Sequence, residues 1–96
     1  MKKELAVLKS GDWSLNLEDP YYETHLGEIF AESVDAVRQT KEGCYVNLVT
    51  PGVHGDPRDW LIGPLHDRLR AAELAIREIR YIDECGCGGH VTRVFR

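Results

Sequence analysis

The sequence predicts an α/β fold, with α+β as the alternative class, built on a single small mixed sheet of four to five strands with two main helices. Apolar runs of strand length occur at five places along the chain, some alternating with polar residues and some continuous. Two longer stretches carry one apolar stripe at helical spacing. The predicted order is ββαβαββ. A chain of 96 residues has the size of one domain, so we expect residues 1–96 to fold as a single unit.

The first half of the chain predicts two strands and a helix. Leu5–Leu8 is a short apolar run, and apolar residues alternate with polar ones over residues 13–17, which is typical of a strand with one buried face. Asp19-Pro20 favours a helix start, because Asp caps the first turn and Pro at the first helical position loses no hydrogen bond. Gly43 is placed to end that helix. The inner stripe of this predicted helix contains Leu26, Ile29, Phe30, Ser33, Val34 and Val37.

The second half predicts a buried strand, a helix and a final pair of strands. Residues 44–49 are apolar on both faces, which indicates a central strand with helices packed over it. Thr50–Pro57 contains two Pro and two Gly and reads as a loop. A second helix is expected from about Pro64, and strands are expected over residues 79–84 and 91–95. The inner stripe of this helix contains Leu65, Leu69, Ala72 and Ile76.

The connections between these elements predict where a site would lie. Strand–helix–strand units place the joined strands parallel, so residues 13–17, 44–49 and 79–84 should run in one direction, with the last strand turning back. The loop after the second of these strands contains His54 and Asp56, and a Cys/Gly-rich segment, residues 85–89, follows the third. Both should therefore lie along the edge of the sheet where open α/β sheets place their sites.

Charge and composition exclude several classes of function. The formal net charge is −4, and residues 1–36 hold eight acidic residues against three lysines, which disfavours nucleic-acid binding. No apolar run is long enough for a membrane span or a signal peptide, so we expect a cytoplasmic protein. The sequence holds no phosphate-binding loop, dinucleotide-binding turn or nucleophile elbow, and we expect no catalytic residues. Exposed strand edges leave a homodimer open.

Three cysteines are an odd number, which argues against a disulfide framework and for a reducing compartment. Two of them lie in a segment that three glycines make flexible, and this segment is expected to be an exposed tip between the last two strands. Its residues are Cys85, Gly86, Cys87, Gly88 and Gly89.

The residues of this segment allow three uses. A Cys85–Cys87 disulfide would close a strained, easily reduced ring. The two thiolates with His90, or with His54, would give a soft zinc or iron site, although the spacing is a weak signal and Asp56 or His66 would serve equally. The tip is also accessible enough to be the substrate of a modifying enzyme. A thiol enzyme is a weaker reading, because no base near Cys85 is evident.

The C-terminal part of the sequence resembles a known family. Residues 85–94, CGCGGHVTRV, are similar to the signature of the CGCGG family of radical-SAM-modified RiPP proteins, which are ribosomally made and then enzymatically modified. Residues 13–18 and 46–51, with the His54–Pro57 stretch, also resemble blocks of that family. The resemblance covers roughly residues 12–95 and is specific only in its ten-residue C-terminal part.

The resemblance implies a small non-catalytic precursor or carrier protein that is post-translationally modified by a radical SAM/SPASM maturase. The modification would fall within the CGCGG segment, Cys85–Gly89, and the folded remainder would be what the maturase recognises. No cofactor is expected in the chain itself on this reading. The alternative function is a small metal-binding or thiol-redox protein that uses Cys85 and Cys87 with His90 or His54.

Overall fold

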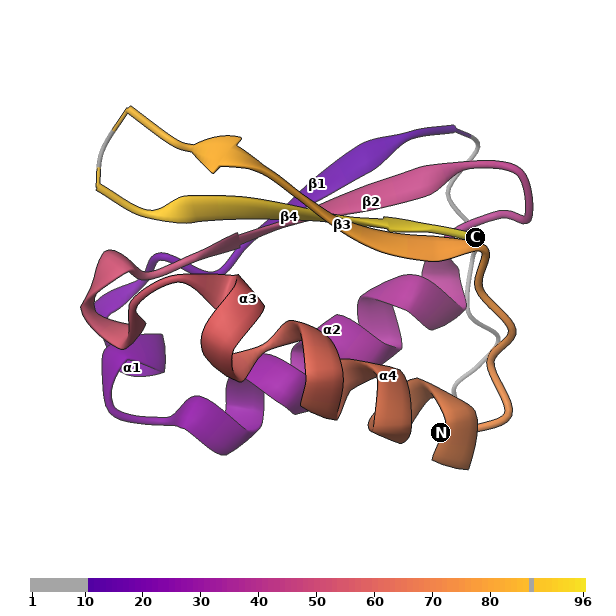
Figure 1. Cartoon of the computed structure of the whole chain (residues 1–96), viewed down its shortest axis with the longest axis horizontal. Helices are drawn as coiled ribbons and strands as arrows, with labels where there is room; N and C mark the ends of the chain where they lie inside the picture. Colours follow the sequence, from indigo (N-terminus) through magenta and orange to yellow (C-terminus); the bar gives the residue numbers. More distant parts are fainter. Residues whose placement is uncertain (1–10, 87) are drawn as a thin grey trace.

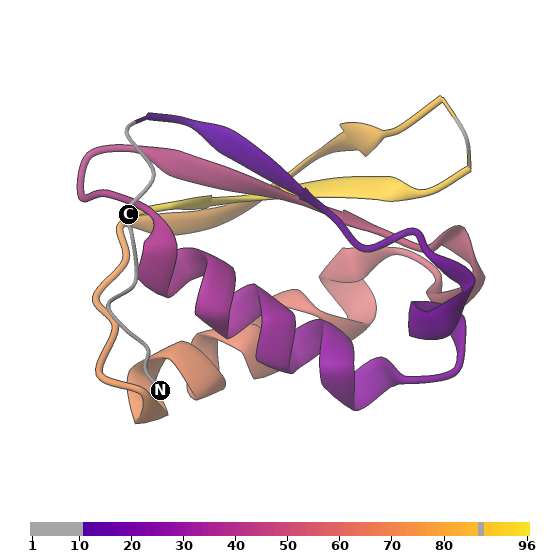
Figure 2. The ribbon, with the colours of Figure 1, turned by 180° about the vertical axis from the view of Figure 1, so that it is seen from behind.

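The computed structural model describes residues 11–86 and 88–96, in which one four-stranded mixed sheet packs on a layer of helices. Figures 1 and 2, which view the chain from opposite sides, show the helices on one face of the sheet. This confirms the α/β class. The elements are β1 (Trp13–Asn16), α1 (Pro20–Glu23), α2 (Leu26–Gln39), β2 (Tyr45–Thr50), the 3-10 helix η1 (Gly52–His54), α3 (Pro57–Trp60), α4 (Ile62–Ala71), β3 (Glu78–Glu84) and β4 (His90–Phe95). The predicted strand Leu5–Leu8 lies outside the described residues.

The spatial order of the strands is β1-β2-β4-β3. β1 is parallel to β2, and β4 is antiparallel to both β2 and β3. The strands β1, β2 and β3 therefore run in one direction, as predicted, but β4 lies between β2 and β3. Because of this direction, the chain leaves β1, β2 and β3 at the same edge of the sheet.

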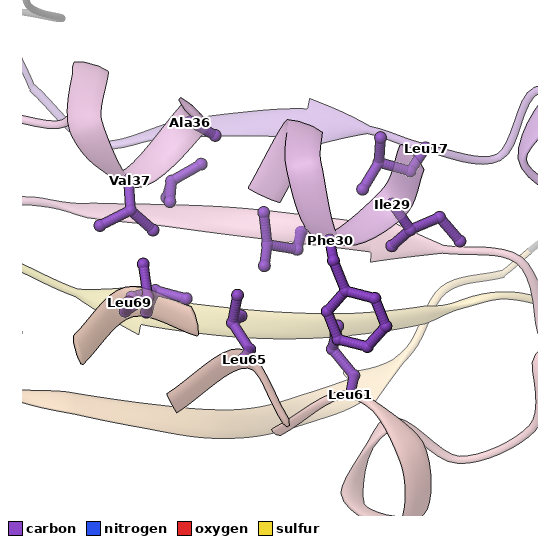
Figure 3. Close-up of a cluster of buried hydrophobic side chains, with 11 residues drawn as sticks. Leu17, Ile29, Phe30, Ala36, Val37, Leu61, Leu65 and Leu69 are labelled. Atoms are coloured by element: carbon purple, nitrogen blue, oxygen red, sulfur yellow. The ribbon is translucent and has the colours of Figure 1, made fainter. Parts of the chain in front are cut away.

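The core lies between the sheet and the helices. It is formed by the apolar stripes of α2 and α4 against alternate residues of β2 and β4, as Figure 3 shows for the helical side chains. Burial of these aliphatic and aromatic groups is the main favourable term in folding a chain of this size. The buried apolar residues are Leu17, Ile29, Phe30, Ala36, Val37, Val46, Leu48, Leu61, Leu65, Leu69 and Val94.

The burial of β2 differs from the prediction. Val46, Leu48 and Thr50 are buried, but Tyr45, Asn47 and Val49 on the other face are only half-buried. Among the described elements, helices cover one face only, so the prediction of a strand buried on both sides is wrong.

The first predicted helix is interrupted at Thr24 and His25. In a continuous helix the carbonyl oxygen of Tyr21 would accept the backbone N–H of His25. Instead, Thr24 Oγ1 and His25 Nδ1 lie 3.3 and 2.8 Å from that oxygen. These side chains compete for the carbonyl, which ends α1 and restarts the chain as α2.

The second predicted helix begins earlier and ends earlier than expected. α4 starts at Ile62, and Pro64 is tolerated as its third residue because the first turn has no intrahelical partners for its N–H groups. The helix ends at Ala71, where Glu73 adopts a left-handed φ of 59° and the Leu74 N–H bonds to the Leu69 carbonyl at 2.9 Å. Within the described residues, no helix is of the length and hydropathy that crossing a membrane requires.

Candidate functional site

The loops that follow β1, β2 and β3 meet at one edge of the sheet, at the end where the β3–β4 hairpin turns. Glu18 follows β1, Gly52 follows β2, and Cys85 follows β3. The return strand β4 begins at His90, opposite Thr50 of β2. The contacts described below bring the 50–57 loop beside the cysteine–glycine segment.

The cysteine–glycine segment closes as a tight hairpin loop. The backbone N–H of Cys85 donates to the carbonyl of Gly89 at 2.9 Å, and the N–H of Gly88 donates to the carbonyl of Cys85 at 3.3 Å. Gly88 has a φ of +96°, a conformation that residues with a Cβ rarely adopt. The turn therefore requires glycine at this position. Cys87 lies outside the described residues.

Two glycines of the loop pack directly against neighbouring backbone. A Cβ on Gly52 would overlap the carbonyl group of Gly88, and a Cβ on Gly89 would overlap Glu18 Oε2 and lie 2.5 Å from the carbonyl oxygen of Thr50. Gly52 and Gly89 thus allow η1 and the hairpin to approach more closely than other residues would. Gly86 and Gly88 are exposed, whereas Gly89 is buried. The segment is only in part the open tip that its composition predicts.

The thiol of Cys85 is the first chemically distinctive group of the site. Its Sγ donates a hydrogen bond to Glu18 Oε2 at 3.0 Å, a contact between residues 67 apart in the sequence. Both side chains are half-buried. Glu18 is held near the end of β1 by a hydrogen bond of 2.8 Å from its backbone N–H to Asn16 Oδ1. The fold therefore provides a carboxylate acceptor for a thiol that lies beside glycine backbone.

A pocket of about 430 Å³ adjoins this contact. The carboxylates of Glu18 and Glu23 line it together with Gly52 and Val53 of η1 and the Gly88-Gly89 backbone. Val53 is 68% exposed. The loop backbone thus borders an open, acidic cavity.

His54 is engaged in holding loops together. Its Nε2 lies 2.9 Å from the carbonyl oxygen of Tyr22 and therefore donates to it, and its ring lies 5.3 Å from that of Trp60. Trp60 Nε1 in turn donates to the Gly55 carbonyl at 3.1 Å. These contacts join α1, η1 and α3 at the edge of the site, which gives His54 a structural role.

Asp56 caps α3 and forms an ion pair with Arg58. Its carboxylate accepts the Arg58 backbone N–H at 2.9 Å and the guanidinium Nη2 at 2.6 Å. The side-chain hydrogen bonds from Arg58 are the main reason that the pKa of Asp56 is lowered to about 2. The guanidinium also lies 4.5 Å from the centre of the Tyr81 ring.

His90 is paired with Tyr81. The Tyr81 hydroxyl and His90 Nδ1 are 2.9 Å apart across the β3–β4 pair. Desolvation raises the pKa of Tyr81, and the negative charge of Asp56 contributes in the same direction. The hydroxyl therefore stays protonated over a wide pH range and can donate to the imidazole.

The proposed zinc or iron ligands do not form a cluster in the part of the chain that the structure describes. No three His, Cys, Asp or Glu side chains come together there in a way that would hold a metal ion. Cys85 contacts Glu18, His90 contacts Tyr81, and His54 contacts the Tyr22 backbone. Cys44, the third cysteine, lies before β2 at the opposite end of the sheet from Cys85.

The sequence reasoning missed Glu18, Arg58 and Tyr81 as residues of this region. Glu18 had a usable signal, since it directly follows a predicted strand whose end meets the same edge. Tyr81 and Arg58 gave none, because their contact depends on how α3 is placed against β3.

Comparison with known proteins gives one result. The family model described as "Putative radical SAM target protein" matches residues 5–96. No match was found among curated proteins or among solved structures. The match covers nearly the whole chain, including the hairpin loop and every element of the sheet.

Proposed function

Because the chain belongs to the radical SAM target family, we propose that it is a non-catalytic, RiPP-type precursor or carrier protein modified by a radical SAM/SPASM enzyme within Cys85–Gly89. The family match over residues 5–96 carries the proposal. The family name itself implies a radical SAM enzyme as partner. The position of the modification is inferred from the chemistry of the loop.

The loop offers the kind of carbon that radical chemistry uses. Gly86 and Gly88 are exposed, and among the described residues, their chain neighbours aside, no atom lies within 4 Å of the Cβ position at either glycine. A hydrogen atom on such a carbon is accessible from solvent. The enzyme and its cofactors supply the reaction, so this chain has only to present the loop.

The fold supports presentation by holding the two ends of the loop. β3 and β4 pair from Glu78 and Phe95 to Glu84 and His90, with a register shift between Tyr81 and Asp83, and the Cys85–Gly89 hydrogen bond closes the pair. An enzyme would thus meet the loop beside the acidic pocket, which Gly88 and Gly89 line. A folded scaffold of this kind differs from a disordered leader, because recognition would depend on tertiary structure.

The test is co-expression of the full chain with its radical SAM/SPASM enzyme, followed by intact mass measurement and peptide sequencing. We expect a mass change confined to the peptide that contains residues 85–89, and none when the enzyme lacks its iron–sulfur cluster. The Cys44 peptide is the internal control. An unchanged mass while the enzyme cleaves S-adenosylmethionine would overturn the proposal, and stoichiometric zinc or iron in the untreated chain would favour the metal-binding function instead.

A further inference from the structure

Three groups converge on one Cα–H bond of Gly89. The direction in which an L side chain would leave this carbon points at Glu18 Oε2, at the Thr50 carbonyl oxygen and at Cys85 Sγ, which lies 3.2 Å from the ideal Cβ position. The same sulfur donates its hydrogen bond to Glu18. The structure therefore places three groups close together: a sulfur nucleophile, an acceptor for its proton and a carbon without a side chain.

We infer that the modification is a thioether bond between Cys85 Sγ and the Cα of Gly89, an inference that rests on the proposed function. Gly88 is disfavoured by geometry, because no described atom outside its own chain neighbours, and so not Cys85 Sγ, lies within 4 Å of its Cβ position. Of Gly88 and Gly89, which are not chain neighbours of Cys85, Gly89 is the one whose Cα–H bond faces its thiol.

The closed loop has to shift for this bond to form. Gly89 is buried, and the Thr50 carbonyl leaves no room for a substituent on the Cα of Gly89. Thr50 belongs to β2, whereas Cys85 and Gly89 are joined to each other by the 2.9 Å hydrogen bond that closes the hairpin. Lifting the hairpin from β2 therefore exposes the Gly89 carbon and keeps the sulfur beside it. Glu18 has a flexible side chain that can follow the thiol.

The reaction balances as a two-electron oxidation of the chain. One Cα–H bond of Gly89 and the S–H bond of Cys85 break, and one C–S bond forms. The hydrogen atom passes from Cα to the 5′-deoxyadenosyl radical that the enzyme makes from S-adenosylmethionine. The thiol proton passes to the Glu18 carboxylate and from there to solvent, and the remaining electron passes to an iron–sulfur cluster of the enzyme. The chain loses two hydrogen atoms in total.

The experiment uses the full chain, produced with α-dideuterated glycine and treated with the enzyme and S-adenosylmethionine. We expect Gly89 to lose one deuterium and the number of alkylatable thiols to fall from three to two, with no recovery after reduction. Cys85→Ser should abolish the change. Cys87→Ser, in the same segment, and Cys44→Ser, at the other end of the sheet, are matched controls that should retain it.

Several results would overturn the thioether. Thiols that reappear on reduction would show a disulfide, and retention of both deuterium atoms at Gly89 would exclude its Cα. Modification that survives Cys85→Ser but not Cys87→Ser would assign a different sulfur. A mass change with both deuterium atoms retained at Gly89, or with a different sulfur, leaves a modified loop, so the proposed function would stand while the thioether fails. An unchanged mass would contradict the proposed function itself.

Discussion

The two ends of the sheet are held by different kinds of contact. At the end where β1 and β2 begin, Arg96 Nη1 lies 3.2, 3.1 and 2.9 Å from the carbonyl oxygens of Val37, Arg38 and Thr40. These carbonyls lie at the C-terminal end of α2, where the helix dipole favours a cation. Trp13 Nε1 adds a hydrogen bond of 2.9 Å to Thr40 Oγ1.

At the other end, the cysteine–glycine loop is held mainly by close packing of backbone. Gly52 fits against Gly88, Gly89 fits against Thr50, and a thiol–carboxylate hydrogen bond joins Cys85 to Glu18. A thiol is a weak donor, and glycine contacts bury little apolar surface. The first end is therefore held by stronger hydrogen bonds than the second.

The largest effect is expected from Arg96→Ala, which removes the guanidinium from the C-terminal end of α2. Hydrogen bonds to charged groups contribute about 1.5–3 kcal/mol, so we expect the free energy of unfolding to fall by about this amount. Urea unfolding followed by circular dichroism measures it. Arg96→Lys is the control, and a loss below about 0.5 kcal/mol for Arg96→Ala would show that this end is not held by the guanidinium.

Gly52→Ala is expected to act at the loop end. Its Cβ would overlap the Gly88 carbonyl, so η1 and the hairpin must separate, at a cost of about 1–3 kcal/mol. Amide hydrogen exchange should rise at Cys85 and Gly88, whose N–H groups close the loop. Gly86→Ala is the matched control, because nothing lies within 4 Å of its Cβ position. Equal exchange in both variants would contradict the close packing of Gly52 on Gly88.

The order of strands and helices along the sequence predicted the strand directions that bring these loops together. The common direction of β1, β2 and β3 follows from the strand–helix–strand order, and it places Cys85 and the Gly52 loop at one edge. The insertion of β4 between β2 and β3 was not predictable, since a returning strand can pair on either side.

Two further features of the structure could not be predicted from sequence patterns. The break between α1 and α2 depends on the Thr24 and His25 side chains reaching the Tyr21 carbonyl, which amphipathic spacing does not encode. The Glu18–Cys85 contact joins residues 67 apart and depends on the register of two non-adjacent strands. Sequence patterns identified the loop, but its carboxylate partner required the fold.

Glu18→Gln tests how much the hydrogen bond between the Cys85 thiol and the Glu18 carboxylate contributes to holding the loop. We expect the free energy of unfolding to fall by only about 0.5–1.5 kcal/mol, the range for a single hydrogen bond. The rate of Cys85 alkylation should change more clearly. Alkylation proceeds through the thiolate, and a carboxylate at this distance repels the thiolate by about 1 kcal/mol in water. Alkylation of Cys85, followed by peptide mass spectrometry, should be about fivefold faster in the variant by the same estimate. The thiol donates to Glu18, so Glu23→Gln in the same pocket is the control. An equal acceleration there would assign the effect to general charge.

The smallest effect is expected from the acid titration of Asp56, whose ion pair with Arg58 lies at the surface beside the site. Hydrogen bonds from Arg58 lower its pKa from 3.8 to about 2, so the folded chain binds fewer protons than the unfolded chain between these values. The stabilisation is therefore complete above about pH 4 and is lost as the pH falls toward 2. It remains small because solvent screens exposed ion pairs. The measurement is the urea midpoint of unfolding from pH 5 to pH 2. Asp56→Asn should remove this part of the loss of stability in acid. Asp59→Asn, which changes an exposed carboxylate of α3, should leave that loss unchanged. An acid profile unchanged by Asp56→Asn would mean that the Arg58 ion pair does not hold α3 beside the loop, and that the packing of His54 on Trp60 holds it instead.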